Sequence, residues 1–383
     1  MEHLINENVK NIQISGIRKF FNLVQGKEDM ISLTIGQPDF QTPNHIKEST
    51  KQALDQNFTT YTPNAGIIDL RSAVSDVVQE KYNLNYQPED EVIITVGASQ
   101  AIDITLRTIL SPGDEVLLPG PVYPGYEPLI KLAGGTPVYV DTRENDFKFT
   151  ADLIEQHITS KTKCVILPYP SNPTGVTLQY DELEAIVNLL KDLPVFILAD
   201  EIYSELTYGN EHVSIGSFKE VREQTFIIQG VSKSHSMTGF RIGFLLGPNS
   251  LMKHVLKVHQ YNVSCATSTS QYAALAALTN GKNDPNEMRN EYRRRRDYVL
   301  ERLNNMGVDV VAPDGAFYVF PKLTPNNKTS FDFGLELVND AKLALVPGDA
   351  FSSYGQGYMR ISYAYHMDIL KKGLDRLENF INK

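Results

Sequence analysis

Cysteine is scarce in this chain of 383 residues, where only Cys164 and Cys265 occur. Two cysteines exclude a disulfide framework and favour a reducing compartment, so we expect a cytoplasmic protein. The chain also lacks an apolar run long enough to span a bilayer. Its polar first residues, MEHLINENVKN, show no signal-peptide pattern. We therefore expect no membrane partner.

An excess of positive charge is missing as well, because 46 Asp and Glu outnumber 36 Lys and Arg, for a formal net charge of −10. Such a protein is a poor non-specific ligand for nucleic acid, and we expect no nucleic-acid partner. One basic run, EYRRRRDY at 291–298, contains Glu291 and Asp297, which predicts the solvated face of a helix. No G-x-G-x-x-G opens a strand–helix unit, which argues against a nicotinamide dehydrogenase.

From about residue 90 the chain alternates apolar runs with amphipathic stretches. The runs that we expect to be strands are EVIITVG (91–97), DEVLLPG (114–120), TPVYVD (136–141), CVILPYP (164–170), VFILADE (195–201), TFIIQG (225–230) and IGFLLG (242–247). Apolar strands separated by helices predict an α/β fold with a mainly parallel sheet covered by helices. Ligand sites in such sheets lie beyond the carboxyl ends of the strands.

The character of the chain changes again near residue 285. A long helix over 286–306 precedes short runs of antiparallel type and a last helix near 367–381, which predicts a smaller α+β domain. In the N-terminal segment we expect a helix capped at Ser15. The predicted organisation is an N-terminal segment (1–45) that packs with the small domain, a large domain (46–284) and a small C-terminal domain (285–383).

Small or polar residues follow two of the earlier predicted strands. GASQA, at 97–101, would present backbone N–H groups at a helix start, together with the Ser99 hydroxyl, to an anion. Any tight strand-to-helix turn also uses small residues, so this pattern alone is ambiguous. SNPTG places Asn172 at a turn, where its amide either faces a ligand or only shapes the backbone.

Charged residues follow the two later strands. Asp200 ends a buried run and is either a desolvated carboxylate paired with a cation or a helix cap. Lys233 follows TFIIQG, and Arg241 lies eight residues further on. A lysine partly removed from water becomes a nucleophile, and an arginine fork suits a phosphate. Taken singly, Lys233 is better explained as a loop lysine and Arg241 as an interdomain arginine.

Together these groups match the requirements of pyridoxal 5′-phosphate (PLP). The phosphate would take the GASQA turn and Arg241, and the aldehyde would take Lys233. A carboxylate at Asp200 would keep the ring nitrogen protonated, which makes the ring an electron sink. Asn172 and Tyr203, one turn beyond Asp200, would hold the ring oxygen.

The stretch GVSKSHSMTGFRIG, at 230–243, resembles the PLP-attachment signature of class I aminotransferases. GASQA, SNPTG, ADEIY and YMRIS occur in the order and spacing of that family, and the resemblance runs from IGQPDF at 35–40 to the last helix. It implies a fold type I PLP-dependent transferase that moves amino groups between amino acids and 2-oxo acids. It also implies a homodimer with shared active sites.

The resemblance assigns a role to each matching residue around the cofactor ring. Lys233 would bind PLP and move a proton between substrate and cofactor, and Asp200 would pair with the ring nitrogen. Tyr203 and Asn172 would bond the ring oxygen, and Tyr123 would stack on the ring.

The remaining roles concern the phosphate and the substrate. The residues expected to bind the phosphate are Ala98, Ser99, Gln100, Ser232, Arg241 and Tyr61 of the partner subunit. Arg360, Gly36 and Asn172 would bind the substrate, with Arg360 gripping its α-carboxylate. Many family members have serine three residues before the lysine where this chain has Gly230, so one phosphate hydroxyl is missing here.

Other functions of the same site stay open at this point. A PLP-dependent β-lyase would use the same residues, whereas a transcription regulator of this type would need a DNA-binding extension. Overall, the chain is similar to bacterial N-acetyl-LL-2,6-diaminopimelate aminotransferases, which implies glutamate as donor and a role in lysine biosynthesis. A general aromatic or alanine aminotransferase is the alternative. Ile17 and Arg18 would belong to a movable cover, with Arg18 either near a distal carboxylate or simply solvated.

Overall fold

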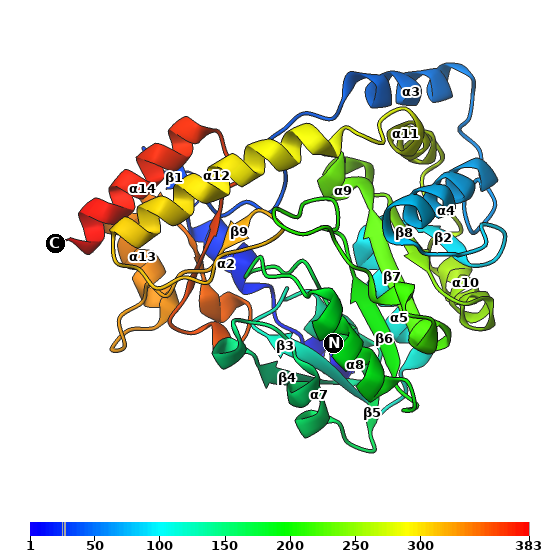
Figure 1. The fold of residues 1–383 in the computed structure, drawn as a ribbon, viewed down its shortest axis with the longest axis horizontal. Coiled ribbons are helices and arrows are strands. Elements are labelled where there is room, and N and C mark those ends of the chain that lie inside the picture. Colours follow the sequence, from blue (N-terminus) through cyan, green and yellow to red (C-terminus); the bar gives the residue numbers. More distant parts are fainter. Residues whose placement is uncertain (25, 27, 383) are drawn as a thin grey trace.

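The computed structural model describes residues 1–24, 26 and 28–382. These residues form a large α/β part and a smaller part beside it, joined by the long helix α12 (Figure 1). Within the described residues, no helix combines the length and the apolar character needed to cross a membrane.

The large part is built on a seven-stranded sheet with the order β2-β8-β7-β6-β5-β3-β4. Only β8 runs antiparallel to its neighbours, so the predicted mainly parallel sheet is confirmed. Its strands are β2 (Val92–Thr95), β3 (Glu115–Gly120), β4 (Thr136–Asp141), β5 (Thr162–Leu167), β6 (Phe196–Asp200), β7 (Thr225–Gly230) and β8 (Gly243–Leu246).

Helices cover both faces of this sheet because both faces are apolar. Along β5, Val165 and Leu167 join the core on one face, whereas Cys164 and Ile166 join the core on the other. This alternation follows from the two-residue period of a strand. One face is covered by α4 (Ile68–Tyr82), α7 (Ala151–His157), α8 (Tyr180–Leu190) and α11 (Ser268–Thr279). The other is covered by α5 (Gly97–Ile109), α6 (Tyr126–Leu132) and α10 (Asn249–Val263).

The smaller part contains two short sheets and the C-terminal helices. Antiparallel pairing joins β9 (Tyr318–Val319), β12 (Met359–Ser362) and β11 (Val346–Pro347). A parallel pair joins β1 (Ile31–Ser32) to β10 (Leu343–Ala344). The helices here are α2 (Gly16–Val24), α12 (Pro285–Asn305), α13 (Ser330–Asp340) and α14 (Met367–Ile381). The other elements are α1 (Glu7–Lys10), α3 (Asn44–Asp55), α9 (Val231–Ser234), and the 3₁₀ turns η1 (Glu2–Leu4), η2 (Arg143–Asn145), η3 (Ile215–Ser217), η4 (Lys219–Gln224), η5 (Thr238–Phe240), η6 (Gly348–Ala350) and η7 (Ser353–Gly355).

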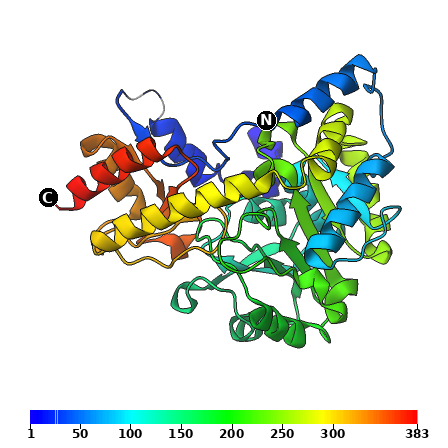
Figure 2. The same cartoon turned by 45° about the horizontal axis from the view of Figure 1, so that its top comes forward.

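After α2, two segments carry the chain between the parts. The chain from β1 to α3 passes from the smaller part to the large part, and α12 makes the return crossing, as both views show (Figures 1 and 2). The pairing of β1 with β10 ties the N-terminal segment to the C-terminal elements. The domain boundaries at 45 and 284 stay predictions.

The basic run at 291–298 is not simply the solvated face that its composition suggested. Arg293 and Arg294 are exposed, but Arg295 is buried in the same helix, with 4% of its surface accessible. The prediction is wrong for Arg295 because its guanidinium pairs with two acidic side chains, Asp39 and Glu291, while the rest of the arginine is covered. Local charge counting could not reveal Asp39, which is 256 residues away along the chain.

Candidate active site

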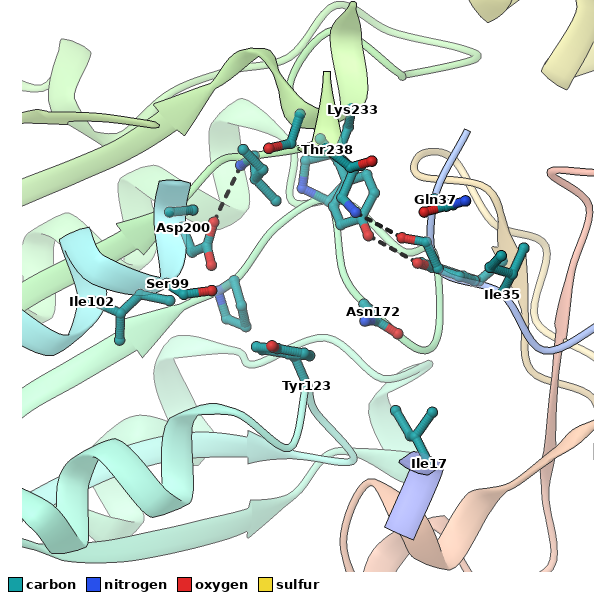
Figure 3. Close-up of a pocket in the computed structure, with 18 of the residues that line it drawn as sticks. Ile17, Ile35, Gln37, Ser99, Ile102, Tyr123, Asn172, Asp200, Lys233 and Thr238 are labelled. Atoms are coloured by element: carbon teal, nitrogen blue, oxygen red, sulfur yellow. Dashed lines mark hydrogen bonds between the residues drawn. The ribbon is translucent and has the colours of Figure 1, made fainter. Parts of the chain in front are cut away.

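A cavity of about 410 Å³ lies beyond the carboxyl ends of β5, β6 and β7, between the two parts of the molecule. Most of the predicted site residues line it: Gly36, Ala98, Ser99, Tyr123, Asn172, Asp200, Tyr203, Ser232, Lys233, Arg241 and Arg360. In Figure 3, Ser99 and Ile102 of α5 approach from one side, and Ile35 and Gln37 from the other. The fold thus assembles residues that are scattered over more than three hundred positions.

Lys233 lies on α9, the single helical turn that follows β7. Its Nζ donates a hydrogen bond to the carbonyl oxygen of Gly36 at 2.7 Å (Figure 3). The same nitrogen lies 5.8 Å from the centre of the Tyr203 ring. Burial, followed by the positive charges of Arg360 and Arg241, lowers the pKa of Lys233 to about 8. A neutral, nucleophilic amine is therefore far more accessible here than on an ordinary lysine.

Asp200 ends β6 and lies next to β7 because the two strands pair in parallel, with Asp200 opposite Ile228. The Tyr126 hydroxyl donates to Oδ2 of Asp200 at 2.7 Å, and the Ile202 N–H donates to Oδ1 at 3.2 Å. Burial raises the pKa of this carboxyl, while the two hydrogen bonds oppose that rise. Asp200 thus has donors on both oxygens and faces a cavity, which goes beyond a simple helix cap.

An anion cradle is present where α5 begins. Gly97 has φ +72°, and a Cβ there would come within 2.4 Å of Nη2 of Arg241. Only glycine therefore permits both this backbone and the close approach of the guanidinium. Nη1 of Arg241 donates to the carbonyl oxygen of Thr238 at 2.9 Å. The helix start, its free N–H groups and the arginine together suit a phosphate group.

Arg360, on β12, is 2% exposed and anchors the opposite end of the cavity. Its Nη1 donates to Oδ1 of Asn172 at 2.9 Å, and its Nη2 donates to the carbonyl oxygen of Thr34 at 2.6 Å. The guanidinium lies 4.3 Å from the centre of the Tyr318 ring. Its Nε has no hydrogen-bond partner within the described part of the chain. Burial lowers the pKa of Arg360, but an arginine stays charged. This donor set suits a carboxylate.

Aromatic rings complete the wall between these charged groups. Tyr123 faces the cavity and makes an edge contact with Tyr126, with ring centroids 5.6 Å apart (Figure 3). Burial raises the pKa of Tyr123. The hydroxyls of Tyr203 and Tyr318 are hydrogen-bonded at 2.9 Å. Burial raises the pKa of Tyr203 well above its usual range.

Two predicted residues do not line the cavity. Oε1 of Gln100 accepts from the Val96 N–H at 2.6 Å, and Nε2 donates to Asn262 at 2.8 Å, so its side chain is engaged within the large part. Tyr61 is 87% exposed on the surface of this chain. The cavity also contains residues that the sequence analysis missed. Tyr126 and Tyr318 are the most important of these, since they bond Asp200 and Tyr203.

A signal for one of the two was present in the sequence. Tyr126 begins α6 and follows Tyr123 by three residues, and its N–H bonds the Tyr123 carbonyl in the turn that precedes the helix. No comparable local signal marks Tyr318, because its partners Tyr203 and Arg360 come from other elements.

Known proteins resemble this chain over nearly its whole length. The sequence model for aminotransferase class I and II matches residues 28–377. The probable N-acetyl-LL-diaminopimelate aminotransferase of Bacillus subtilis is 60% identical over 100% of this chain and 97% of that protein. The aromatic-amino-acid aminotransferase 2 of Thermococcus litoralis is 40% identical, covering 99% and 98%. The solved aspartate aminotransferase from Thermus thermophilus with maleate has a TM-score of 0.92 at 35% identity, covering 98% and 99%.

The environment of Lys233 predicts an unusual titration in protein freed of any cofactor. Because burial destabilises the ammonium form, its proton should leave at lower pH than from a solvated lysine. The rate at which acetic anhydride labels Lys233, followed by mass spectrometry, should therefore rise through a midpoint near pH 8. In urea-unfolded protein the midpoint should return to about 10.4. A midpoint above 10 in the folded protein would contradict the burial argument.

Proposed function

This chain belongs to the class I and II aminotransferases and is an aminotransferase. On that premise we propose that it binds PLP at Lys233. We further propose that it aminates N-acetyl-2-amino-6-oxopimelate with glutamate as donor. The observation that carries the cofactor proposal is the convergence of Lys233, Asp200 and Arg241 on one cavity. The substrate proposal depends instead on the 60% identity to the Bacillus subtilis relative of that name.

The residues present fit PLP at each of its functional groups. The start of α5 with Arg241 suits the phosphate, and the amine of Lys233 suits the aldehyde. Asp200 is placed at the end of β6 to accept a hydrogen bond from the ring nitrogen. Asn172 uses its oxygen to bind Arg360, which leaves its amide N–H groups for the ring oxygen beside Tyr203.

Bound PLP supplies a protonated pyridine ring that withdraws electrons from the α-carbon of the substrate. Asp200 would hold the proton on the ring nitrogen, and the hydrogen bonds from Tyr126 and the Ile202 N–H favour its ionised form against the effect of burial. When its amine is free, Lys233 would move the proton between the α-carbon of the substrate and the cofactor, and burial favours the neutral amine that this requires.

Arg360 is proposed to bind the α-carboxylate that every donor and acceptor of this reaction shares. Its present acceptors are a neutral amide oxygen and a backbone carbonyl. A charged carboxylate that takes two N–H groups makes stronger bonds than these neutral acceptors. Gly36 lies at the same end, and a Cβ there would meet the Tyr318 hydroxyl at 2.9 Å, so the close backbone approach needs glycine.

The far end of the cavity gives the substrate side chain a less charged environment. Among the described residues that line the cavity, the cations are Lys233, Arg241 and Arg360, and each already has a role. Ile17 of α2 contributes apolar surface there, whereas Arg18 is exposed and is not a lining residue. An adaptable wall suits an enzyme that accepts two different side chains in turn. Whether α2 moves as a cover stays a prediction.

We also propose a cytoplasmic homodimer in which Tyr61 of the partner subunit completes the phosphate site. The exposure of Tyr61 on this chain is compatible with that role, since a side chain 87% accessible is free to reach another subunit.

The attachment site can be tested with borohydride. Reduction of the purified, cofactor-loaded protein should fix PLP to the peptide that contains Lys233, as mass spectrometry would show. Lys233→Ala should abolish this labelling and most of the turnover, because no other group is placed to move the proton. Attachment to a different lysine would overturn the assignment.

The substrate proposal predicts an order of acceptors. With glutamate as donor, kcat/KM for N-acetyl-2-amino-6-oxopimelate should exceed that for pyruvate or phenylpyruvate by at least about 10-fold, since contacts to a longer side chain are made only by this acceptor. The comparison needs steady-state rates with all three acceptors on one enzyme preparation. If phenylpyruvate or pyruvate is preferred, a general aromatic or alanine aminotransferase replaces the proposed specificity.

Shared sites predict complementation between two inactive chains. A mixed dimer of Lys233→Ala and Tyr61→Phe subunits contains one site with both residues intact and should recover activity that the two parent homodimers lack. The matched control mixes Lys233→Ala with Arg241→Ala, two residues proposed to act in the same subunit. Equal activity in both mixtures, or a fully active monomer, would be incompatible with sharing.

A further inference from the structure

Arg295 is the arginine of the basic run at 291–298 whose side chain is buried. Its Nη1 donates to both carboxylate oxygens of Asp39, at 2.9 and 2.8 Å, and its Nε donates to Glu291 at 2.8 Å. The guanidinium also lies 5.4 Å from the ring centres of Phe40 and Tyr292. A charge held in this way by two acids and two rings has one fixed position, unlike its exposed neighbours.

Asp39 belongs to the segment that forms the substrate side of the cavity. It lies three residues after Gly36, in the crossing between β1 and α3. Arg295 belongs to α12, the other crossing. The ion pair therefore joins the two connections between the parts of the molecule, at a point next to the proposed carboxylate site.

Two of the hydrogen bonds that hold this segment come from side chains that are also proposed to bind ligands. Lys233 donates to the carbonyl oxygen of Gly36, and Arg360 donates to that of Thr34. In the proposed function, Lys233 binds the cofactor and Arg360 binds a carboxylate, so neither is free to anchor the segment throughout a turnover. Contacts that do not exchange include the backbone hydrogen bonds of Leu33 with Ala344 and Ser362, which hold the start of the segment. Further along, the Tyr365 hydroxyl binds Ile35, the Thr42 hydroxyl binds Ser236, and Asp39 pairs with Arg295.

We propose that Arg295 is a positioning residue that acts through Asp39 to hold residues 34–37 in the geometry that receives the substrate carboxylate. This proposal depends on the proposed roles of Lys233 and Arg360. We call the ion pair between Asp39 and Arg295 the Asp39 clamp. It lies between Ile35 and Thr42 in the segment, three residues after Gly36, and it joins the segment to the middle of the 21-residue helix α12.

Packed aromatic rings connect the Asp39 clamp to the surroundings of Lys233. The Tyr292 hydroxyl donates to Oδ1 of Asp39 at 3.2 Å, and its ring packs on Phe317, with centroids 5.5 Å apart. The centre of the Phe317 ring in turn lies 5.9 Å from Nζ of Lys233. Displacing Asp39 would therefore disturb packed rings as well as the backbone of the segment.

The test compares Arg295→Met with Arg294→Met, on the same helix. Arg294 binds Glu291 too but is 59% exposed and has no contact with Asp39, so it controls for lost charge and for Glu291. In Arg295→Met the KM for glutamate and for the acceptor should both rise by about 10-fold, because a shift of the segment smaller than the 1 Å that can cost roughly 100-fold already weakens carboxylate binding. The dissociation constant of succinate, a carboxylate that cannot react, should rise by a similar factor in calorimetry.

Further variants separate positioning from stability. Asp39→Asn keeps the size of the side chain and should raise the same constants, and Arg295→Met with Asp39→Asn should be no worse than the more affected single variant. Arg295→Lys should recover only part of the loss, because a single ammonium replaces the two nitrogens, Nη1 and Nε, that bind Asp39 and Glu291. A merely structural role would lower the melting temperature while leaving KM and succinate binding at wild-type values, and that result would overturn the proposal.

The proposal and its premise fail in different ways. If Arg360→Lys binds succinate as wild type does, the carboxylate site itself is misassigned. If Arg360→Lys loses succinate binding but Arg295→Met and Asp39→Asn behave like Arg294→Met, the premise stands and the positioning role is wrong.

Discussion

Burial of positive charge around one carboxylate is the constraint on which the site depends. Among the described residues that line the cavity, Lys233, Arg241 and Arg360 are cationic, and Asp200 is the carboxylate. The charges of Arg360 and Arg241 add to burial in lowering the pKa of Lys233, whereas Asp200 opposes them. Arg360 is buried and Lys233 is partly buried, whereas Arg241 is exposed, and cations withdrawn from water are costly unless anions meet them. A phosphate at Arg241 and a carboxylate at Arg360 supply that balance, so the same electrostatics that activate the lysine favour the proposed ligands.

The sheet brings these charges together through its strand order. Because β6 and β7 are parallel neighbours, Asp200 and the turn that carries Lys233 leave the sheet at the same edge. The antiparallel β8 inserts between β7 and β2, and its first residue, Gly243, allows the start of α5 to come close: a Cβ there would lie 2.6 Å from the Ala98 nitrogen. The anion cradle thus results from one reversed strand in an otherwise parallel sheet.

The sequence was sufficient for features that are encoded locally or by strand ends. The mainly parallel sheet, the helices near 286–306 and 367–381, and the proximity of Asp200 to Lys233 follow from periodicity and from the rule that parallel strands share an edge. Arg295 and Tyr318 could not be predicted in this way, because their partners come from remote parts of the chain. The side chain of Gln100 is bonded to Val96 and Asn262, so its predicted part in the phosphate site, through the backbone at the helix start, stays a prediction.

The two ends of the cavity are built from different chemistry, and this difference bears on specificity. On the proposed cofactor side, charged side chains come from α9, β6 and the turn before β8, where they would face the fixed groups of one ligand. On the substrate side, backbone carbonyls of Thr34 and Gly36 accept from Arg360 and Lys233, and nearby Ile17 and Ile35 are apolar. Backbone groups and apolar side chains can meet several substrates without leaving an unpaired buried charge. In the proposed function, ionic recognition would be concentrated at the α-carboxylate, and the accuracy with which residues 34–37 are held would decide how well the side chain beyond it is presented for reaction.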